Sequence, residues 1–150
     1  EPVPQLPQGM RVALHPGRLS KMLQSTVGDF LINSRDGRVL GIELKTERRE
    51  HTGNLFLETW SNKSRGRRGW LYTLDADFLW YLFLDTKNHY VISFPKLKQW
   101  ALADGHLTRF PERAQKKYTQ MNDAYGRCVP IRVIEREVGF VKLNNTISTQ

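Results

Sequence analysis

The fold is decided by two runs of sequence, Val27-Gly-Asp-Phe-Leu-Ile-Asn33 and Val39-Leu-Gly-Ile-Glu-Leu-Lys-Thr46. Apolar residues alternate with other residues in both runs, which is the pattern of β-strands that bury one face. Between them, Arg35-Asp-Gly37 forms a three-residue loop in which glycine supplies the left-handed conformation. The two runs are therefore predicted to form a β-hairpin in which Ser34 pairs with Arg38.

The register of this hairpin decides which side chains meet. Counting back from the pair Ser34–Arg38 places Asp29 opposite Glu43, with Lys45 on the same face. The other face is apolar and consists of Phe30, Ile32, Leu40, Ile42 and Leu44. Like charges directly opposite each other destabilise a sheet unless something compensates them. A bound cation would compensate the two carboxylates, so the hairpin is predicted to hold a divalent metal.

The available ligands favour one class of metal. Carboxylate oxygens are hard ligands that suit Mg²⁺ or Mn²⁺, ions which keep several waters and share ligands with phosphate. Zinc is a poor fit, because the chain has a single cysteine, Cys128, and its histidines lack paired ligand spacing. We therefore expect Mg²⁺ as the cofactor, with Mn²⁺ able to replace it.

Asp29 followed by Glu43-Leu-Lys45 on a hairpin resembles the core motif of the PD-(D/E)xK, or restriction-endonuclease-like, nuclease superfamily. The resemblance covers the chain from Val27 to Phe94. It implies a restriction-endonuclease-like α/β fold, with a central mixed β-sheet flanked by helices. It also implies Mg²⁺-dependent hydrolysis of nucleic-acid phosphodiesters, with Asp29, Glu43 and the backbone carbonyl of Leu44 around the metal. Lys45 would orient the attacking water or stabilise the transition state.

The chain departs from the family pattern in two places. Gly28 stands where the family often has proline. The family usually opens with a helix that often carries a glutamate, whereas the short helix expected at Gly17–Ser25 offers only Gln24. Glu58, on the strand-like run Leu55-Phe-Leu-Glu-Thr-Trp60, is a further candidate ligand for the metal.

The chain carries a large surplus of positive charge. Its 150 residues include 23 Lys and Arg against 15 Asp and Glu, which gives a net charge of +8 and a pI near 9.9. Such a surplus favours a polyanionic partner, and nucleic acid is the commonest one. A membrane is a poorer fit, because no apolar run approaches the roughly 20 residues that span a bilayer.

One stretch, Ser61-Asn-Lys-Ser-Arg-Gly-Arg-Arg-Gly69, concentrates positive charge without any acid. It is predicted to be a flexible loop bracketed by aromatic residues. Its cations are predicted to contact phosphates, and a nearby arginine pair extends the same surface. These residues are Lys63, Arg65, Arg67 and Arg68, together with Arg48 and Arg49. Trp60 and Trp70 are interpreted either as core anchors or as platforms for an exposed base, and Trp70 is kept among the candidate nucleic-acid-binding residues.

The pattern along the chain indicates one domain over residues 1–150, with a proline-rich arm at 1–8 and a polar tail at 144–150. The runs 27–33, 39–46 and 55–60 are predicted to form a three-stranded meander. The apolar run 77–84 is predicted to be a central strand in a hairpin with 89–94. Pro95 is expected to open a helix that ends near Ala103. The run 130–138 is predicted to be a strand.

These features favour a metal-dependent endonuclease that hydrolyses the phosphodiester bonds of DNA. Two alternatives stay open: a non-catalytic nucleic-acid-binding module of the same fold, and a basic RNA-binding or assembly protein in which Asp29 and Glu43 lie on an ion-paired surface. The expected partner is nucleic acid, DNA before RNA, with no membrane and with a homodimer as an option. A single cysteine and the lack of a secretory signal favour a cytoplasmic location.

Overall fold

The computed structural model describes residues 11–13, 28–115 and 123–144. The proline-rich arm, the helix expected at 17–25 and the tail beyond residue 144 lie outside these ranges. The described strands are β1 (Arg11–Ala13), β2 (Phe30–Asn33), β3 (Val39–Glu47), β4 (Asn54–Asn62), β5 (Arg67–Arg68), β6 (Phe78–Phe83), β7 (Asn88–Ser93), β8 (Glu112–Ala114), β9 (Tyr125–Pro130) and β10 (Val141–Asn144). The helices are α2 (Trp70–Thr73), α3 (Phe94–Leu102), α4 (Ile131–Glu137) and the 3₁₀ helix η1 (Leu107–Arg109).

The larger sheet is mixed and has the strand order β1-β2-β3-β6-β7-β10. Strands β3 and β6 run parallel, and every other neighbouring pair is antiparallel. The sequence of β6, Phe-Leu-Trp-Tyr-Leu-Phe, is apolar on both faces, which suits a central strand with one face buried and the other partly covered. The structure thus confirms an α/β fold with a central mixed sheet, and the predicted hairpin of β6 with β7.

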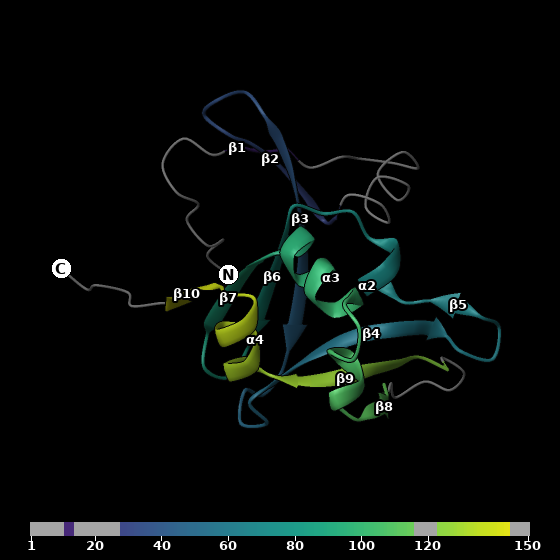
Figure 1. The fold of residues 1–150 in the computed structure, drawn as a ribbon. Coiled ribbons are helices and arrows are strands. Elements are labelled where there is room, and N and C mark those ends of the chain that lie inside the picture. Colours follow the sequence, from purple (N-terminus) through teal and green to yellow (C-terminus); the bar gives the residue numbers. More distant parts are fainter. Residues whose placement is uncertain (1–10, 14–27, 116–122, 145–150) are drawn as a thin grey trace.

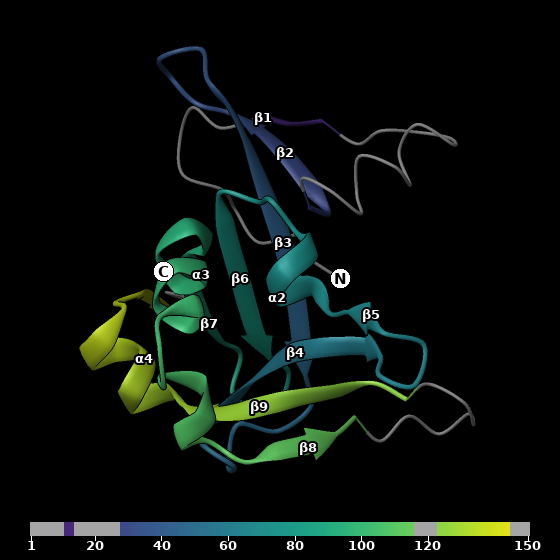
Figure 2. The same ribbon diagram turned by 45° about the vertical axis from the view of Figure 1, so that its right-hand side comes forward.

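The second sheet is antiparallel, in the order β5-β4-β9-β8, and its strands run across those of the mixed sheet (Figures 1 and 2). The predicted three-stranded meander is wrong, because β4 belongs to this second sheet. The edge of β3 that β4 was expected to occupy is taken by β6. Strand β4 alternates buried residues with partly exposed ones such as Glu58, which suits a sheet with one solvated face better than a central position.

The main hydrophobic core lies between the two sheets and beneath the helices. Leu57 of β4, Leu79 of β6 and Ile134 of α4 are all fully buried in it. Helices α2 and α3 lie on the same face of the mixed sheet (Figures 1 and 2). The expected inner face of α3 is confirmed, since Leu97, Trp100 and Ala101 are buried. No helix in the described ranges is long and apolar enough to cross a membrane.

The prediction of a strand at 130–138 is wrong, because Ile131–Glu137 form helix α4. The apolar residues Ile131, Ile134 and Val138 recur with helical spacing and pack on the core together with Val133. The helix ends where Gly139 adopts a left-handed conformation and donates its N–H to the carbonyl of Ile134 at 2.7 Å. A strand over these residues would leave part of this apolar set in solvent.

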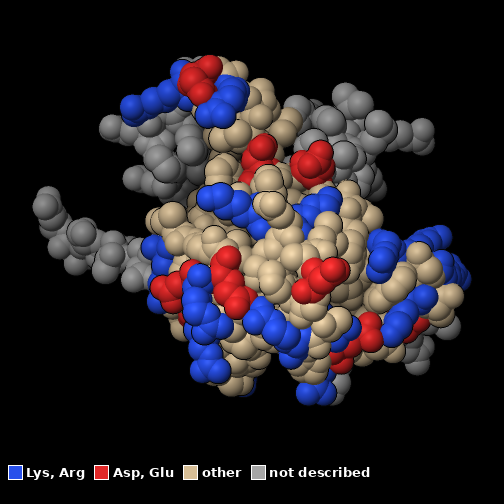
Figure 3. Space-filling model, viewed as in Figure 1, with Lys and Arg blue, Asp and Glu red and all other residues tan. Residues whose placement is uncertain are grey.

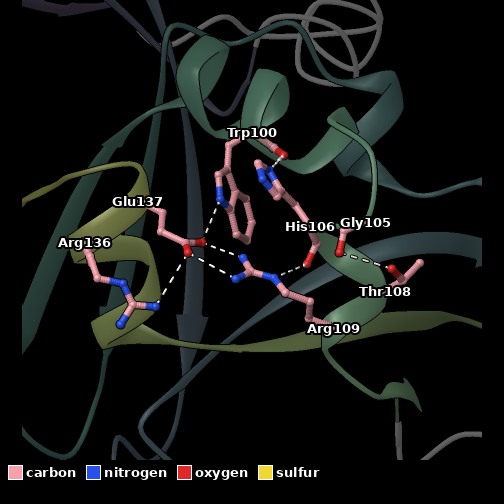
Figure 4. Close-up of polar contacts among 7 residues, drawn as sticks. All are labelled: Trp100, Gly105, His106, Thr108, Arg109, Arg136 and Glu137. Atoms are coloured by element: carbon pink, nitrogen blue, oxygen red, sulfur yellow. Dashed lines mark hydrogen bonds and ion pairs between the residues drawn. The ribbon is translucent and has the colours of Figure 1, made fainter.

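Glu137, at the end of α4, ties three elements together (Figure 4). Its carboxylate accepts hydrogen bonds from the indole Nε1 of Trp100 at 3.0 Å and from both terminal nitrogens of Arg109 at 3.1 and 2.5 Å. Arg109 in turn donates to the carbonyl of His106 at 3.2 Å. The hydrogen bonds from Arg109, with smaller contributions from Trp100, lower the pKa of Glu137 to about 2. This network fixes α4 against α3 and η1.

Replacing Glu137 with Gln should lower the melting temperature at neutral pH, because Arg109 loses its ionic partner. The lowered pKa means that the carboxylate stabilises the fold above the ordinary pKa of 4.5, and that this contribution is lost as pH falls to about 2. The gap in melting temperature between wild type and Glu137→Gln should therefore narrow over that range. Glu135→Gln, on an exposed residue of the same helix, is the control. A gap that does not change with pH would contradict the assignment.

Candidate metal and nucleic-acid site

The structure brings Asp29 and Glu43 together as the hairpin register predicts. Phe30 pairs with Ile42 and Asn33 with Val39, so that Asp29, one residue before β2, lies across from Glu43. The turn closes with the N–H of Ser34 donating to the carbonyl of Arg38 at 2.8 Å. At this position the pairing of β3 with β2 on one edge ends, at Ile42, and its pairing with β6 on the other edge begins, at the same residue.

The backbone around Asp29 holds its carboxylate in place. The Oδ2 atom of Asp29 accepts a hydrogen bond from the N–H of Leu44 at 2.9 Å. Gly28, before it, has a φ of +115° and lies so close to β3 that a Cβ atom would be 2.5 Å from the carbonyl oxygen of Ile42. In a strand, the N–H and the carbonyl of one residue point to the same neighbour. Because the N–H of Leu44 donates to Asp29, its carbonyl is directed to the same side.

Glu43 is a buried carboxylate with a cation beside it. The residue is 7% exposed, and the amino group of Lys45 lies 2.5 Å from its Oε1 atom. Burial raises the pKa of Glu43 above its ordinary value, Lys45 opposes this rise, and the Asp29 carboxylate adds to it through its charge and a hydrogen bond. The side chains of Asp29, Glu43 and Lys45 therefore form one interacting group.

This group lies on the core side of the mixed sheet, not on an outer solvated face. In the parallel pairing of β3 with β6, Glu43 is opposite Leu79 and Lys45 is opposite Tyr81, both of which are core residues. The apolar face of the hairpin points the other way, and Ile32 and Ile42 are buried there, outside the main cluster. The main core lies on the side of Glu43 and Lys45, because the all-apolar β6 supplies apolar residues to both faces of the sheet.

Trp70 connects the group to the second sheet. The amino group of Lys45 lies 5.3 Å from the centroid of the Trp70 ring, which also packs against Phe94. The backbone N–H of Trp70 donates to Oε1 of Glu58 at 3.2 Å. The Glu58 carboxylate is therefore bonded to the start of α2. In the described ranges, no group of three acidic, histidine or cysteine side chains is suited to hold a metal ion. Sequence reasoning missed the place of Trp70 beside Lys45, since no local pattern encodes a contact between β3 and α2.

The donor set at this position consists of two carboxylates in contact and a nearby backbone carbonyl. Such a set suits Mg²⁺, which is usually held by one or two carboxylates with waters and substrate phosphates filling the other positions. Lys45 supplies a positive charge that neutralises Glu43 in the absence of an ion. The same ammonium group is placed to interact with an anionic phosphate near the carboxylates.

The basic stretch forms a β-ribbon and not the flexible loop that was predicted. Strand β5 pairs with the end of β4, and the N–H of Gly66 donates to the carbonyl of Lys63 at 3.0 Å to close the turn. Asn62 supports this turn by accepting a hydrogen bond from the N–H of Arg65 at 3.1 Å. Side-chain hydrogen bonding by Asn62 and the left-handed Gly66 favour an ordered turn.

The four cations of this ribbon have different surroundings. The amino group of Lys63 forms an ion pair with Glu112 at 2.9 Å. The backbone N–H of Lys63 donates to the carbonyl of Asp123 at 2.7 Å. The guanidinium of Arg68 lies 4.5 Å from the ring of Trp60 and 4.3 Å from the ring of Tyr72. Arg65 and Arg67 are exposed, and no described acidic side chain forms an ion pair with either.

Arg48 and Arg49 lie away from this ribbon. They precede the start of β4, whereas the basic turn follows its end. Nine strand residues at about 3.3 Å each separate the two positions by roughly 26–30 Å. Both arginines are exposed, but they do not continue the ribbon surface directly.

Comparison of the chain with protein-family models, with curated proteins and with solved structures found no match. The geometry of the described residues is therefore the basis for assigning a function.

Replacing Gly28 with Ala should destabilise the fold more than the same change at Gly37. Both glycines have positive φ, which costs about 1–2 kcal/mol for other residues, but nothing lies within 4 Å of a Cβ at Gly37. At Gly28 the contact with Ile42 adds roughly 1–3 kcal/mol. Urea denaturation of both variants measures the difference. Equal losses would show that the close approach of Gly28 to β3 does not hold Asp29 in position.

Proposed function

We propose that this protein is a Mg²⁺-dependent endonuclease of the restriction-endonuclease-like kind, which hydrolyses phosphodiester bonds of DNA. One observation carries the proposal: Asp29 and Glu43 meet across the β2–β3 hairpin, with the amino group of Lys45 2.5 Å from Glu43. The sequence order Asp, then Glu-x-Lys, resembles the motif of that superfamily, and the geometry supports the same three residues acting together.

Each residue of the site has a defined part in the proposed reaction. Asp29 and Glu43 would hold the metal, together with the backbone carbonyl of Leu44. The bound ion would supply a polarised phosphate and a water of lowered pKa. Lys45 would leave Glu43 when the metal binds, and its ammonium would orient the attacking water or stabilise charge on the phosphate in the transition state. Trp70 keeps the ammonium near the site, because its ring attracts the cation.

The surface charge supports DNA as the substrate. The ribbon of β4 and β5 carries the exposed cations Arg65 and Arg67, and Figure 3 shows Lys and Arg side chains gathered at the end of the molecule where this ribbon lies. A net charge of +8 attracts a polyanion over long range. Binding by this ribbon and cleavage by the carboxylate pair are separable functions, since they use different residues.

Asp29→Asn and Glu43→Gln should each reduce metal-dependent cleavage of plasmid DNA by at least about 100-fold. Both changes keep the shape of the side chain and remove a metal ligand, so nucleic-acid affinity should stay within about twofold of wild type. Asp104→Asn, on an exposed residue outside the site, should cleave normally. Lys45→Ala should lower turnover by about 100-fold while metal binding persists. Full activity of either carboxylate variant would rule out the proposed site.

A second candidate function is a nucleic-acid-binding module of the same fold without catalysis. The ion pair between Lys45 and Glu43 favours it, because this pair neutralises one carboxylate without any metal. The two candidates differ in their response to Mg²⁺. An enzyme must exchange the Lys45 contact for a metal contact, whereas a binding module has no reason to do so.

Replacing Lys45 with Met tests this exchange. Without the ammonium, the two carboxylates repel each other, so the variant should melt at a lower temperature than wild type in a chelator. Added Mg²⁺ should then raise its melting temperature by more than that of wild type, because no lysine competes for Glu43. The exposed Lys96→Met is the control. If Mg²⁺ leaves both melting temperatures unchanged, the non-catalytic module is the better description.

A further inference from the structure

An arginine and two aromatic rings form a clamp at the edge of the four-stranded sheet. The guanidinium of Arg68, on edge strand β5, lies 4.5 Å from the centroid of the Trp60 ring and 4.3 Å from that of Tyr72. Trp60 belongs to β4 and Tyr72 to α2, so three elements contribute to this aromatic clamp. Arg68 is exposed and both rings are partly exposed. The aromatic clamp is therefore accessible to a partner.

The backbone around the aromatic clamp is fixed before any partner binds. The hydroxyl of Ser61 donates to the carbonyl of Arg68 at 3.1 Å. The N–H of Gly69 donates to the carbonyl of Thr59 at 2.8 Å. Gly69 also lies so close to β4 that a Cβ atom would be 2.4 Å from the carbonyl oxygen of Glu58. Little conformational entropy therefore remains to be lost when a partner binds the clamp.

The guanidinium in the aromatic clamp is held in place without an anion. Among the residues that the structure describes, no acidic side chain forms an ion pair with Arg68. Arginine combines stacking on aromatic rings with bidentate hydrogen bonding to an oxyanion, and its planar donors are already oriented when it stacks. The clamp thus presents the N–H donors of Arg68 to an anionic group of a partner.

The composition of the aromatic clamp indicates a protein partner. Tryptophan, tyrosine and arginine are enriched at the centres of protein–protein interfaces, where a few such residues dominate the binding energy. The planar fork of a guanidinium matches a carboxylate, which accepts two parallel hydrogen bonds from it. Rings around such a pair exclude water from it. A carboxylate on the surface of an acidic protein therefore fits the clamp.

The bases of a nucleic-acid strand fit the aromatic clamp less well. Proteins that bind single strands use aromatic faces on which the bases stack. The rings of Trp60 and Tyr72 each have the guanidinium of Arg68 against one face. Tyr125, which pairs with Trp60 across β4 and β9, has the amino group of Lys63 at 4.8 Å from its ring centroid. Each of the three rings is thus already in contact with a cation of the chain.

We propose that the aromatic clamp is the docking site for an acidic protein, with a carboxylate of the partner bound to Arg68 and the rings of Trp60 and Tyr72 around this ion pair. The Lys and Arg side chains gathered at this end of the molecule (Figure 3) attract such a partner over long range. The clamp shares helix α2 with Trp70, whose ring is 5.3 Å from the amino group of Lys45. Under the proposed function, on which this consequence alone rests, a docked partner obstructs DNA beside the carboxylate pair.

The test measures binding in EDTA to a random copolymer of glutamate and tyrosine, which represents an acidic protein surface, and to oligo(dT) with the same number of negative charges. Arg68→Lys keeps the charge and removes the planar fork, a change that is not conservative at a stacked site. It should weaken copolymer binding by at least about tenfold and change oligo(dT) binding by less than about twofold. Arg67→Lys, on the exposed neighbouring residue, is the matched control and should change both affinities by less than about twofold.

A measurement on the wild type makes the test independent of how the variants fold. In a proton–nitrogen correlation spectrum, the Nε–H signal of Arg68 should shift on addition of the copolymer, and by more than that of Arg67. Absence of copolymer binding, equal losses in the two variants, or a loss of oligo(dT) binding as large as that of copolymer binding would overturn the inference. DNA cleavage in Mg²⁺ is measured separately, and its absence removes the proposed function alone. Where cleavage occurs, the copolymer should inhibit wild type more than Arg68→Lys, and equal inhibition would overturn the obstruction of DNA.

Discussion

The contact between the Asp29 and Glu43 carboxylates is the constraint on which the rest of the site depends. It arises where the antiparallel pairing of β3 with β2 on one edge ends and its parallel pairing with β6 on the other edge begins. Two like charges in a mostly buried position need compensation, and in this structure Lys45 provides it. Burial raises the pKa of Glu43 above its ordinary value, Lys45 opposes this rise and the charge of Asp29 adds to it, so Glu43 binds a proton more readily than an exposed carboxylate would.

The second sheet gives this pair its surroundings. Strand β4 carries Glu58, which fixes the start of α2, and α2 begins with the tryptophan that lies beside Lys45. The same strand continues into the ribbon with the exposed arginines. The polar and basic parts of the molecule are thus connected through one strand and one short helix.

The parts of the site that depend on local geometry could be predicted from the sequence, and the parts that depend on distant pairing could not. The register of Asp29 with Glu43 follows from a three-residue loop, and the buried β6 follows from its uninterrupted apolar residues. In contrast, the pairing of Leu57 with Arg127 joins residues far apart in the chain, and nothing in the sequence of β4 indicates it. The residues of α4 fit both periods, because Ile131 and Val133 alternate while Ile134 and Val138 continue a helical face.

Locating a bound ion directly is the sharpest test of the central claim. A crystal grown with MnCl₂ and measured for anomalous scattering would show where the metal binds. The account predicts one strong peak about 2.1–2.3 Å from carboxylate oxygens of both Asp29 and Glu43, with the amino group of Lys45 displaced from its present contact. No peak at this position, with Lys45 still bound to Glu43, would contradict it and show that the three residues form a permanent ion-paired cluster.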